Sequence, residues 1–197
     1  MQLTEIRVAG FGGQGVILSA IVIGKAASIV EGQHATMTQN FGPEARGGAC
    51  SAQLVVSDQP VLYPYVTNPN ILVVMSQEAY AKFAPELRPG GLMLIEQDLV
   101  RVSSIPVGTR IFGIPATRIA EELGKRMVLN IVMTGFFGAV SGLLERESLR
   151  QAIDSSVPSA FREINLKAYD RGFDYGLEHL KNGALSPAEL EVELVRE

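Results

Sequence analysis

The sequence predicts one α/β domain built on a single doubly wound, mostly parallel sheet, with a helical C-terminal third. Short β-branched runs alternate with longer helical segments, an order typical of parallel sheets covered by helices. A glycine-rich turn joins the first expected strand to the first helix. The 197 residues suffice for one domain with a proper core and are short for two. We assign residues 1–182 to this domain and residues 183–197 to a charged tail that is expected to fray.

The N-terminal half begins with a strand, a turn and a helix. Residues 6–9 form a short β run, 10–15 the glycine turn, and 16–30 a long helix of small and apolar residues, with Gly32 as its C-cap. Two further strands are expected at 34–38 and 49–56, joined by the loop 39–48. Residues 58–69 contain three prolines, which predicts turns and an edge strand rather than a central one.

The second half returns to the strand and helix alternation. The run ILVVM at 71–75 is typical of a strand that is buried on both faces, and it is followed by a helix at 77–87. The remaining strands are expected at 92–95 and 109–114, and the remaining helices at 115–126, 127–144, 147–155 and 158–180.

Composition excludes several classes of function. Hydrophobic residues make up 47% and charged residues 19% of the chain, less than the usual quarter, which we interpret as a wide partner interface. The net charge of −4 disfavours a nucleic-acid partner, which needs a basic face. Cys50 cannot form a disulfide within the chain or ligate an iron–sulfur cluster alone, and with His34 and His179 it shows no metal-binding spacing. The N-terminus lacks a secretory pattern, so a cytoplasmic location is expected.

The stretch 127–144 contains 18 residues without a charge. That is close to the length of a membrane span. It also contains Asn130, Thr134 and Ser141, together with three glycines. A helix that is apolar all round is equally well explained by burial between a sheet and a partner. We therefore expect a buried helix and no membrane association.

The first motif is the turn GFGGQG at 10–15, which satisfies G-x-G-x-x-G between a strand and a helix. Such a turn allows positive φ and presents the free N–H groups of a helix start to an anion, here at Gly12, Gly13, Gln14 and Gly15. A simple tight turn that only packs helix on strand explains the glycines equally well. The end of the second strand and the start of the loop read TMTQN at 36–40, without the acidic residue that would bind a ribose, which disfavours a nicotinamide-dependent dehydrogenase.

The second motif is the loop 39–48, which carries Glu44, Arg46 and Gly47. It follows the carboxyl end of a strand, where open α/β sheets bind ligands. One interpretation is an ion pair between Glu44 and Arg46 that stiffens the loop and contributes little stability if exposed. The other is that Arg46 reaches outward to a carboxylate or phosphate, which its planar guanidinium suits. The sequence leaves both open.

Three segments together resemble the gamma subunit of the 2-oxoacid:ferredoxin oxidoreductases: GFGGQG at 10–15, GPEARGG at 42–48 and LVVMSQEAY at 72–80. The resemblance runs from about residue 6 to about residue 175, and residues 76–80 look most like the 2-oxoglutarate member. It implies a complex that decarboxylates a 2-oxoacid on thiamine diphosphate, transfers the acyl group to coenzyme A and passes electrons through iron–sulfur clusters to ferredoxin.

The same resemblance implies a division of labour between subunits. Thiamine diphosphate and the clusters would be held by the alpha, beta and delta partners, and this chain would contribute no catalytic residue and no cofactor site of its own. A hypothesis from another class is a free-standing phosphate- or nucleotide-binding regulatory module. Co-purification with larger chains distinguishes the two.

Overall fold

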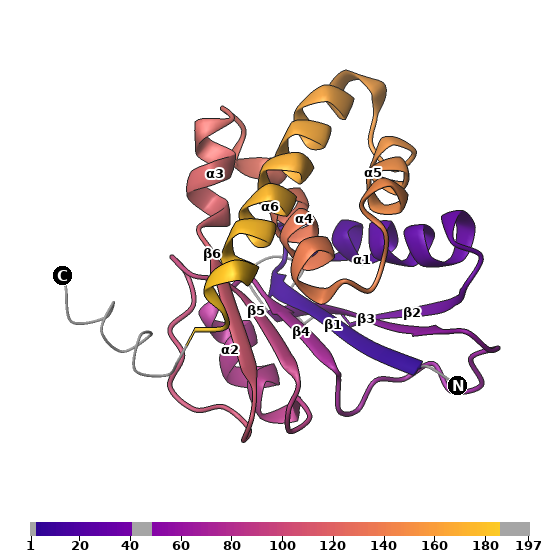
Figure 1. Ribbon diagram of the computed structural model, residues 1–197, viewed down its shortest axis with the longest axis vertical. Helices are drawn as coiled ribbons and strands as arrows, with labels where there is room; N and C mark the ends of the chain where they lie inside the picture. Colours follow the sequence, from indigo (N-terminus) through magenta and orange to yellow (C-terminus); the bar gives the residue numbers. More distant parts are fainter. Residues whose placement is uncertain (1–2, 41–48, 186–197) are drawn as a thin grey trace.

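The strands form one mixed sheet in the computed structural model, which describes residues 3–40 and 49–185 (Figure 1). The sheet order is β2-β3-β1-β4-β5-β6. The pairs β1–β4, β4–β5 and β5–β6 are parallel, whereas β3 is antiparallel to both β1 and β2. Among the strands of the described residues, β3 alone therefore opposes the common direction, which confirms a mostly parallel sheet. The strands are β1 (Leu3–Phe11), β2 (His34–Asn40), β3 (Ala49–Ser57), β4 (Ile71–Val74), β5 (Leu92–Glu96) and β6 (Arg110–Ile114).

Helices cover both faces of the sheet, as a doubly wound fold requires. The helix α2 lies on one face, and α1, α4, α5 and α6 gather on the other (Figure 1). The helices are α1 (Val16–Lys25), α2 (Gln77–Phe83), α3 (Ala116–Glu122), α4 (Leu129–Ser141), α5 (Arg146–Asp154) and α6 (Arg162–Asn182). A π-helical turn (Ala26–Val30) extends α1, and 3-10 turns lie at Ala84–Glu86, Arg126–Val128 and Ser159–Phe161.

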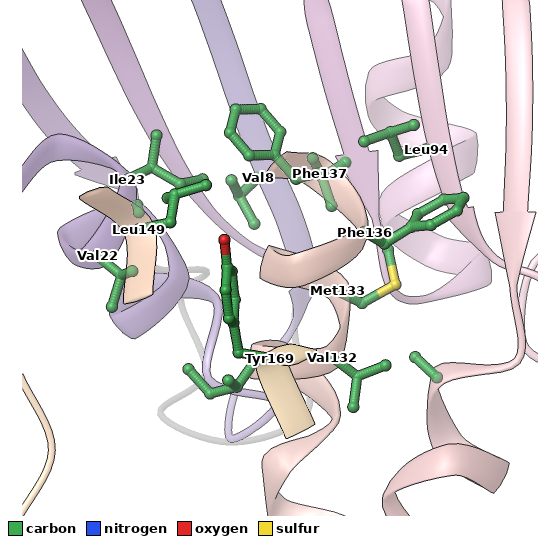
Figure 2. Packing of buried hydrophobic residues seen from close by; sticks show 14 of the residues in the cluster. Val8, Val22, Ile23, Leu94, Val132, Met133, Phe136, Phe137, Leu149 and Tyr169 are labelled. Atoms are coloured by element: carbon green, nitrogen blue, oxygen red, sulfur yellow. The ribbon is translucent and has the colours of Figure 1, made fainter. Parts of the chain in front are cut away.

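The apolar stretch forms the central helix of the larger core. Every residue of α4 from Leu129 to Val140 is buried. Phe136 and Phe137 pack with Met133 among side chains from the sheet, α1 and α6 (Figure 2). The predicted buried helix is therefore confirmed. Within the ranges 3–40 and 49–185, no helix combines the length and apolarity that a bilayer crossing requires.

Two segments differ from the expectation. Residues 58–69 form turns and bends without the expected edge strand, because the three prolines lack N–H donors and side chains from the sheet bind the backbone of Val66 instead. At the other end, Leu185 forms a bridge with Ile111, and its N–H donates to the Ile111 carbonyl oxygen at 2.8 Å. Part of the expected tail thus joins the sheet, and residues 186–197 lie outside the described residues.

Candidate functional site

The candidate site lies at the carboxyl edge of the sheet, between β1 and β4. These two parallel strands are neighbours, yet α1 leaves β1 toward one face and α2 leaves β4 toward the other. Open α/β sheets bind their ligands at such a switch point. In register, Phe11 lies opposite Ala49 and Asn40 lies opposite Ser51, so the strand ends that flank residues 41–48 reach the same edge.

The glycine turn has the backbone geometry that the motif predicts. Gly13 has φ 101° and Gly15 has φ 76°, a left-handed conformation that favours glycine. Gly15 is the N-cap of α1, and it brings no side chain to cap the helix. The first intrahelical bond runs from the Ser19 N–H to the Gly15 carbonyl oxygen. Among residues 3–40 and 49–185 no side chain caps this turn, so its N–H groups can face water, an anion or a partner chain.

The side chain of Gln14 forms two hydrogen bonds within the chain. Its Nε2 donates to the Met75 carbonyl oxygen at 2.8 Å, and its Oε1 accepts from the Phe11 N–H at 2.6 Å. Both polar ends of the carboxamide are thus engaged within the chain. Gln14 braces the ends of β1 and β4, and an anion at this turn would meet peptide N–H groups rather than this side chain.

Asn130 belongs to this edge, although sequence reasoning did not place it there. Its Nδ2 donates to the Gly15 carbonyl oxygen at 3.2 Å, from the first turn of α4. The main-chain carbonyl oxygen of Asn130 accepts from the Ser19 Oγ at 3.2 Å and from the Thr134 Oγ1 at 2.8 Å. A buried amide side chain needs hydrogen-bond partners. An asparagine in a mostly apolar stretch was therefore a sign, visible in the sequence, that Asn130 bonds to another segment.

Cys50 is buried in β3, opposite Gly10 of β1. Burial raises the pKa of its thiol, so the side chain stays protonated near neutral pH. A cluster needs about four thiolates, whereas the sequence has one cysteine, so the donor set does not fit a cluster on this chain. In the part of the chain that the structure describes, no three His, Cys, Asp or Glu side chains are grouped to hold a metal ion.

The other predicted site residues, Glu44, Arg46 and Gly47, lie outside the described residues. Both interpretations of the Glu44 and Arg46 pair therefore stay predictions. The described groups that meet at this edge are peptide N–H groups, two amide side chains and a protonated thiol. These groups can hold segments together or bind an anion, but they offer no general acid or base poised near neutral pH.

Comparison with known proteins points to one family. The model of the family described as pyruvate ferredoxin/flavodoxin oxidoreductase matches residues 5–175. The 2-oxoglutarate synthase subunit KorC of Methanocaldococcus jannaschii is 43% identical over 176 residues, which cover 88% of this chain and 94% of that protein. The crystal structure of a keto/oxoacid ferredoxin oxidoreductase gamma subunit from Geobacter sulfurreducens is 35% identical, with a TM-score of 0.79 over 89% of this chain and 99% of that one.

A third relative is much longer than this chain. The ketoisovalerate oxidoreductase subunit VorA of Methanothermobacter marburgensis is 34% identical over 181 residues. The match covers 90% of this chain but 37% of that protein. In VorA, a region similar to this chain is therefore covalently joined to further sequence.

Proposed function

Because the chain belongs to the pyruvate ferredoxin/flavodoxin oxidoreductase family, as a gamma subunit of the 2-oxoacid:ferredoxin oxidoreductases, we propose that its complex oxidises 2-oxoglutarate. The observation that carries this substrate is the similarity to 2-oxoglutarate synthase subunit KorC over nearly the full length of both proteins. The longer VorA, which is named for ketoisovalerate, is less similar at 34% identity.

In the proposed complex this chain is an accessory subunit beside alpha, beta and delta partners. Decarboxylation of the 2-oxoacid and transfer of the acyl group to coenzyme A release two electrons, which pass through iron–sulfur clusters to ferredoxin. We assign thiamine diphosphate and the clusters to the partner chains, and coenzyme A to the complex. The single buried Cys50 supports this assignment for the clusters, because one thiol cannot replace four.

The carboxyl edge of the sheet is the proposed point of contact with an anion or a partner subunit. Gly12, Gly13 and Gly15 would offer peptide N–H groups there, with Gln14 bracing the turn from within. Glu44, Arg46 and Gly47 would add a charged loop beside it. The first turn of α1 supports this proposal, because no side chain in the described part of the chain caps its N–H groups, and such groups attract negative charge.

The test is to co-express this chain, carrying an affinity tag, with the other subunits and to purify the complex. Coenzyme A-dependent reduction of ferredoxin is then measured with 2-oxoglutarate, pyruvate and 2-oxoisovalerate. We expect kcat/KM for 2-oxoglutarate to exceed the others at least about tenfold, a difference of about 1.4 kcal/mol in transition-state binding. A preference for pyruvate or 2-oxoisovalerate would overturn the substrate, and purification of a nucleotide-binding chain without partners would favour a regulatory module.

A further inference from the structure

An exposed apolar segment lies between β3 and β4, outside the glycine turn. In residues 61–66, which we call the apolar arm, Leu62 is 94%, Tyr63 65% and Tyr65 57% exposed. Other highly exposed apolar residues, such as Ile29 and Met127, stand singly along the chain. Scattered exposed apolar side chains are normal, whereas a contiguous group marks an interaction surface.

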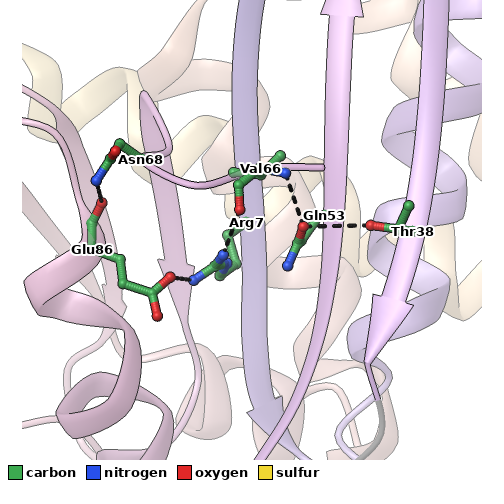
Figure 3. Close-up of polar contacts among 6 residues, drawn as sticks. All are labelled: Arg7, Thr38, Gln53, Val66, Asn68 and Glu86. Atoms are coloured by element: carbon green, nitrogen blue, oxygen red, sulfur yellow. Dashed lines mark hydrogen bonds and ion pairs between the residues drawn. The ribbon is translucent and has the colours of Figure 1, made fainter. Parts of the chain in front are cut away.

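The base of the arm is fixed to the sheet through Val66, which is buried. Its carbonyl oxygen accepts from the Arg7 guanidinium at 2.9 Å, and its N–H donates to the Gln53 Oε1 at 3.0 Å (Figure 3). Arg7 comes from β1 and Gln53 from β3. Arg7 is itself held by an ion pair with Glu86 and by stacking over the Phe83 ring, at 4.7 Å from its centroid. Two strands thus clamp the arm where it meets the sheet.

The exposed end of the arm has a contact of its own. The rings of Tyr63 and Tyr65 meet edge to face, with centroids 5.5 Å apart. Pro64 lies between them and restricts the backbone. Preorganised aromatic side chains lose little conformational entropy on docking, and tyrosine is enriched among residues that dominate binding energy at interfaces. The arm therefore has the properties of a docking element rather than of a solvated loop.

We propose that the apolar arm docks onto a larger subunit of the same oxidoreductase, the one that corresponds to the part of VorA outside its match to this chain. This inference rests on the proposed function. In VorA the two parts are covalently joined, since the match covers 37% of that protein. A separate chain of this size needs a noncovalent surface to hold the same counterpart. The partner surface would be an apolar groove with acceptors for the tyrosine hydroxyls.

The experiment uses the tagged chain co-expressed with the other subunits. The arm variant changes Leu62, Tyr63 and Tyr65 to serine, and the matched control changes the exposed Ile29, Val107 and Met127 to serine. Capture of the larger subunit and the size of the purified complex are measured. We expect the arm variant to retain at most about a tenth of the wild-type association, and the control to retain nearly all of it. Because Leu62 is 94% exposed, Leu62→Asp alone should fold and still weaken capture.

The outcomes distinguish failure of the proposed function from failure of this inference. If the wild-type chain captures no larger subunit, the proposed function fails, and the inference fails with it. If the wild type and the arm variant capture the subunit equally, or if the control loses capture as much as the arm variant does, only the inference is overturned. A wild-type chain that dimerises alone, and an arm variant that is monomeric, would make a second copy the occupant and would also overturn it.

Discussion

The side chain of Gln14 ties β1 to β4, because its Nε2 donates to the carbonyl oxygen of Met75 at 2.8 Å. Met75 follows β4 directly, and its own N–H donates to the Ala9 carbonyl oxygen at 2.9 Å. The switch point of the sheet is thus closed by a side-chain bond and a backbone bond. The glycine turn is therefore braced by bonds within the chain.

Replacing Gln14 by alanine removes the bonds to Met75 and Phe11. We expect the free energy of unfolding to fall by about 1–2 kcal/mol, measured by urea denaturation at pH 7. The exposed Gln151 in α5 provides the matched control, and Gln151→Ala should change stability by no more than about 0.5 kcal/mol. Equal stability of Gln14→Ala and the wild type would show that the brace contributes nothing.

Gly15→Ala should cost more than Gly13→Ala, although both glycines have positive φ. Each variant carries the left-handed strain of about 1–2 kcal/mol. A Cβ at Gly15 would also overlap the amide of Asn130, whereas one at Gly13 would meet open space. We expect the free energy of unfolding of Gly15→Ala to be lower than that of Gly13→Ala by at least about 1 kcal/mol. A double-mutant cycle with Asn130→Ala measures the overlap, and a coupling energy of zero would contradict it.

The contact between α4 and α6 depends on glycine. A Cβ at Gly172 would overlap the carbonyl oxygen of Val132, and one at Gly135 would overlap that of Tyr169. Backbone atoms cannot move aside cheaply, so Gly172→Ala should destabilise the fold by about 3 kcal/mol, seen as a lower Tm. In α1, a Cβ at Gly24 would meet the Leu54 Cδ2 at 3.1 Å, a side-chain contact that a shift of a few tenths of an ångström relieves. Gly24→Ala should therefore leave the Tm unchanged or raise it.

Glu96 should make stability depend on pH. The side chain is fully buried, and its Oε2 and the Thr117 Oγ1 have no hydrogen-bond partner in the described part of the chain. Burial raises the pKa of Glu96 above its ordinary value of 4.5. Between the unfolded and the folded pKa, the folded state holds a proton that the unfolded state lacks, so stability falls as pH rises through this window.

In the wild type the Thr117 N–H donates to the Glu96 Oε1 at 3.0 Å. Glu96→Gln keeps an oxygen that can accept this bond and has no charge to bury. At pH 8 we expect it to be more stable than the wild type by roughly 1 kcal/mol. The difference should disappear below the ordinary carboxyl pKa, where both side chains are neutral. Thermal unfolding from pH 3.5 to pH 8 measures this, with the exposed Glu178→Gln as control. If Glu96→Gln were more stable than the wild type by the same amount at every pH in this range, burial of the Glu96 charge would not be the cause.

Arg46 tests the charged loop of the proposed contact edge. If Arg46 binds an acidic group, Arg46→Ala should leave this domain folded but weaken assembly or turnover of the complex about tenfold or more, since a charge-assisted hydrogen bond contributes roughly 1.5–3 kcal/mol. Arg46→Lys should recover part of this, because an ammonium lacks the planar fork. If Arg46 only pairs with Glu44, then Arg46→Ala and Glu44→Ala should each shift stability by less than about 1 kcal/mol and leave activity unchanged.

Local sequence patterns were sufficient to predict most of the helices and strands. The run at 71–75 predicted β4, which is buried throughout, because adjacent β-branched residues face opposite sides of a strand and here both sides are covered. The uncharged stretch at 127–144 predicted a buried helix, and α4 is one. The family followed from short motifs whose order along the chain is itself specific, with residues 5–175 matching the family model.

Tertiary structure decided the reversed direction of β3 and the detailed roles at the site. The sequence placed Gln14 in a candidate anion-binding or interface turn, but only the fold brings the Met75 carbonyl oxygen within reach of its amide. Asn130 read as one polar residue in an apolar helix, yet it lies on Gly15, from which it is separated by 115 positions. Propensity and periodicity act over a few neighbouring residues, whereas these bonds form only when sheet closure and helix packing bring distant segments to hydrogen-bonding distance.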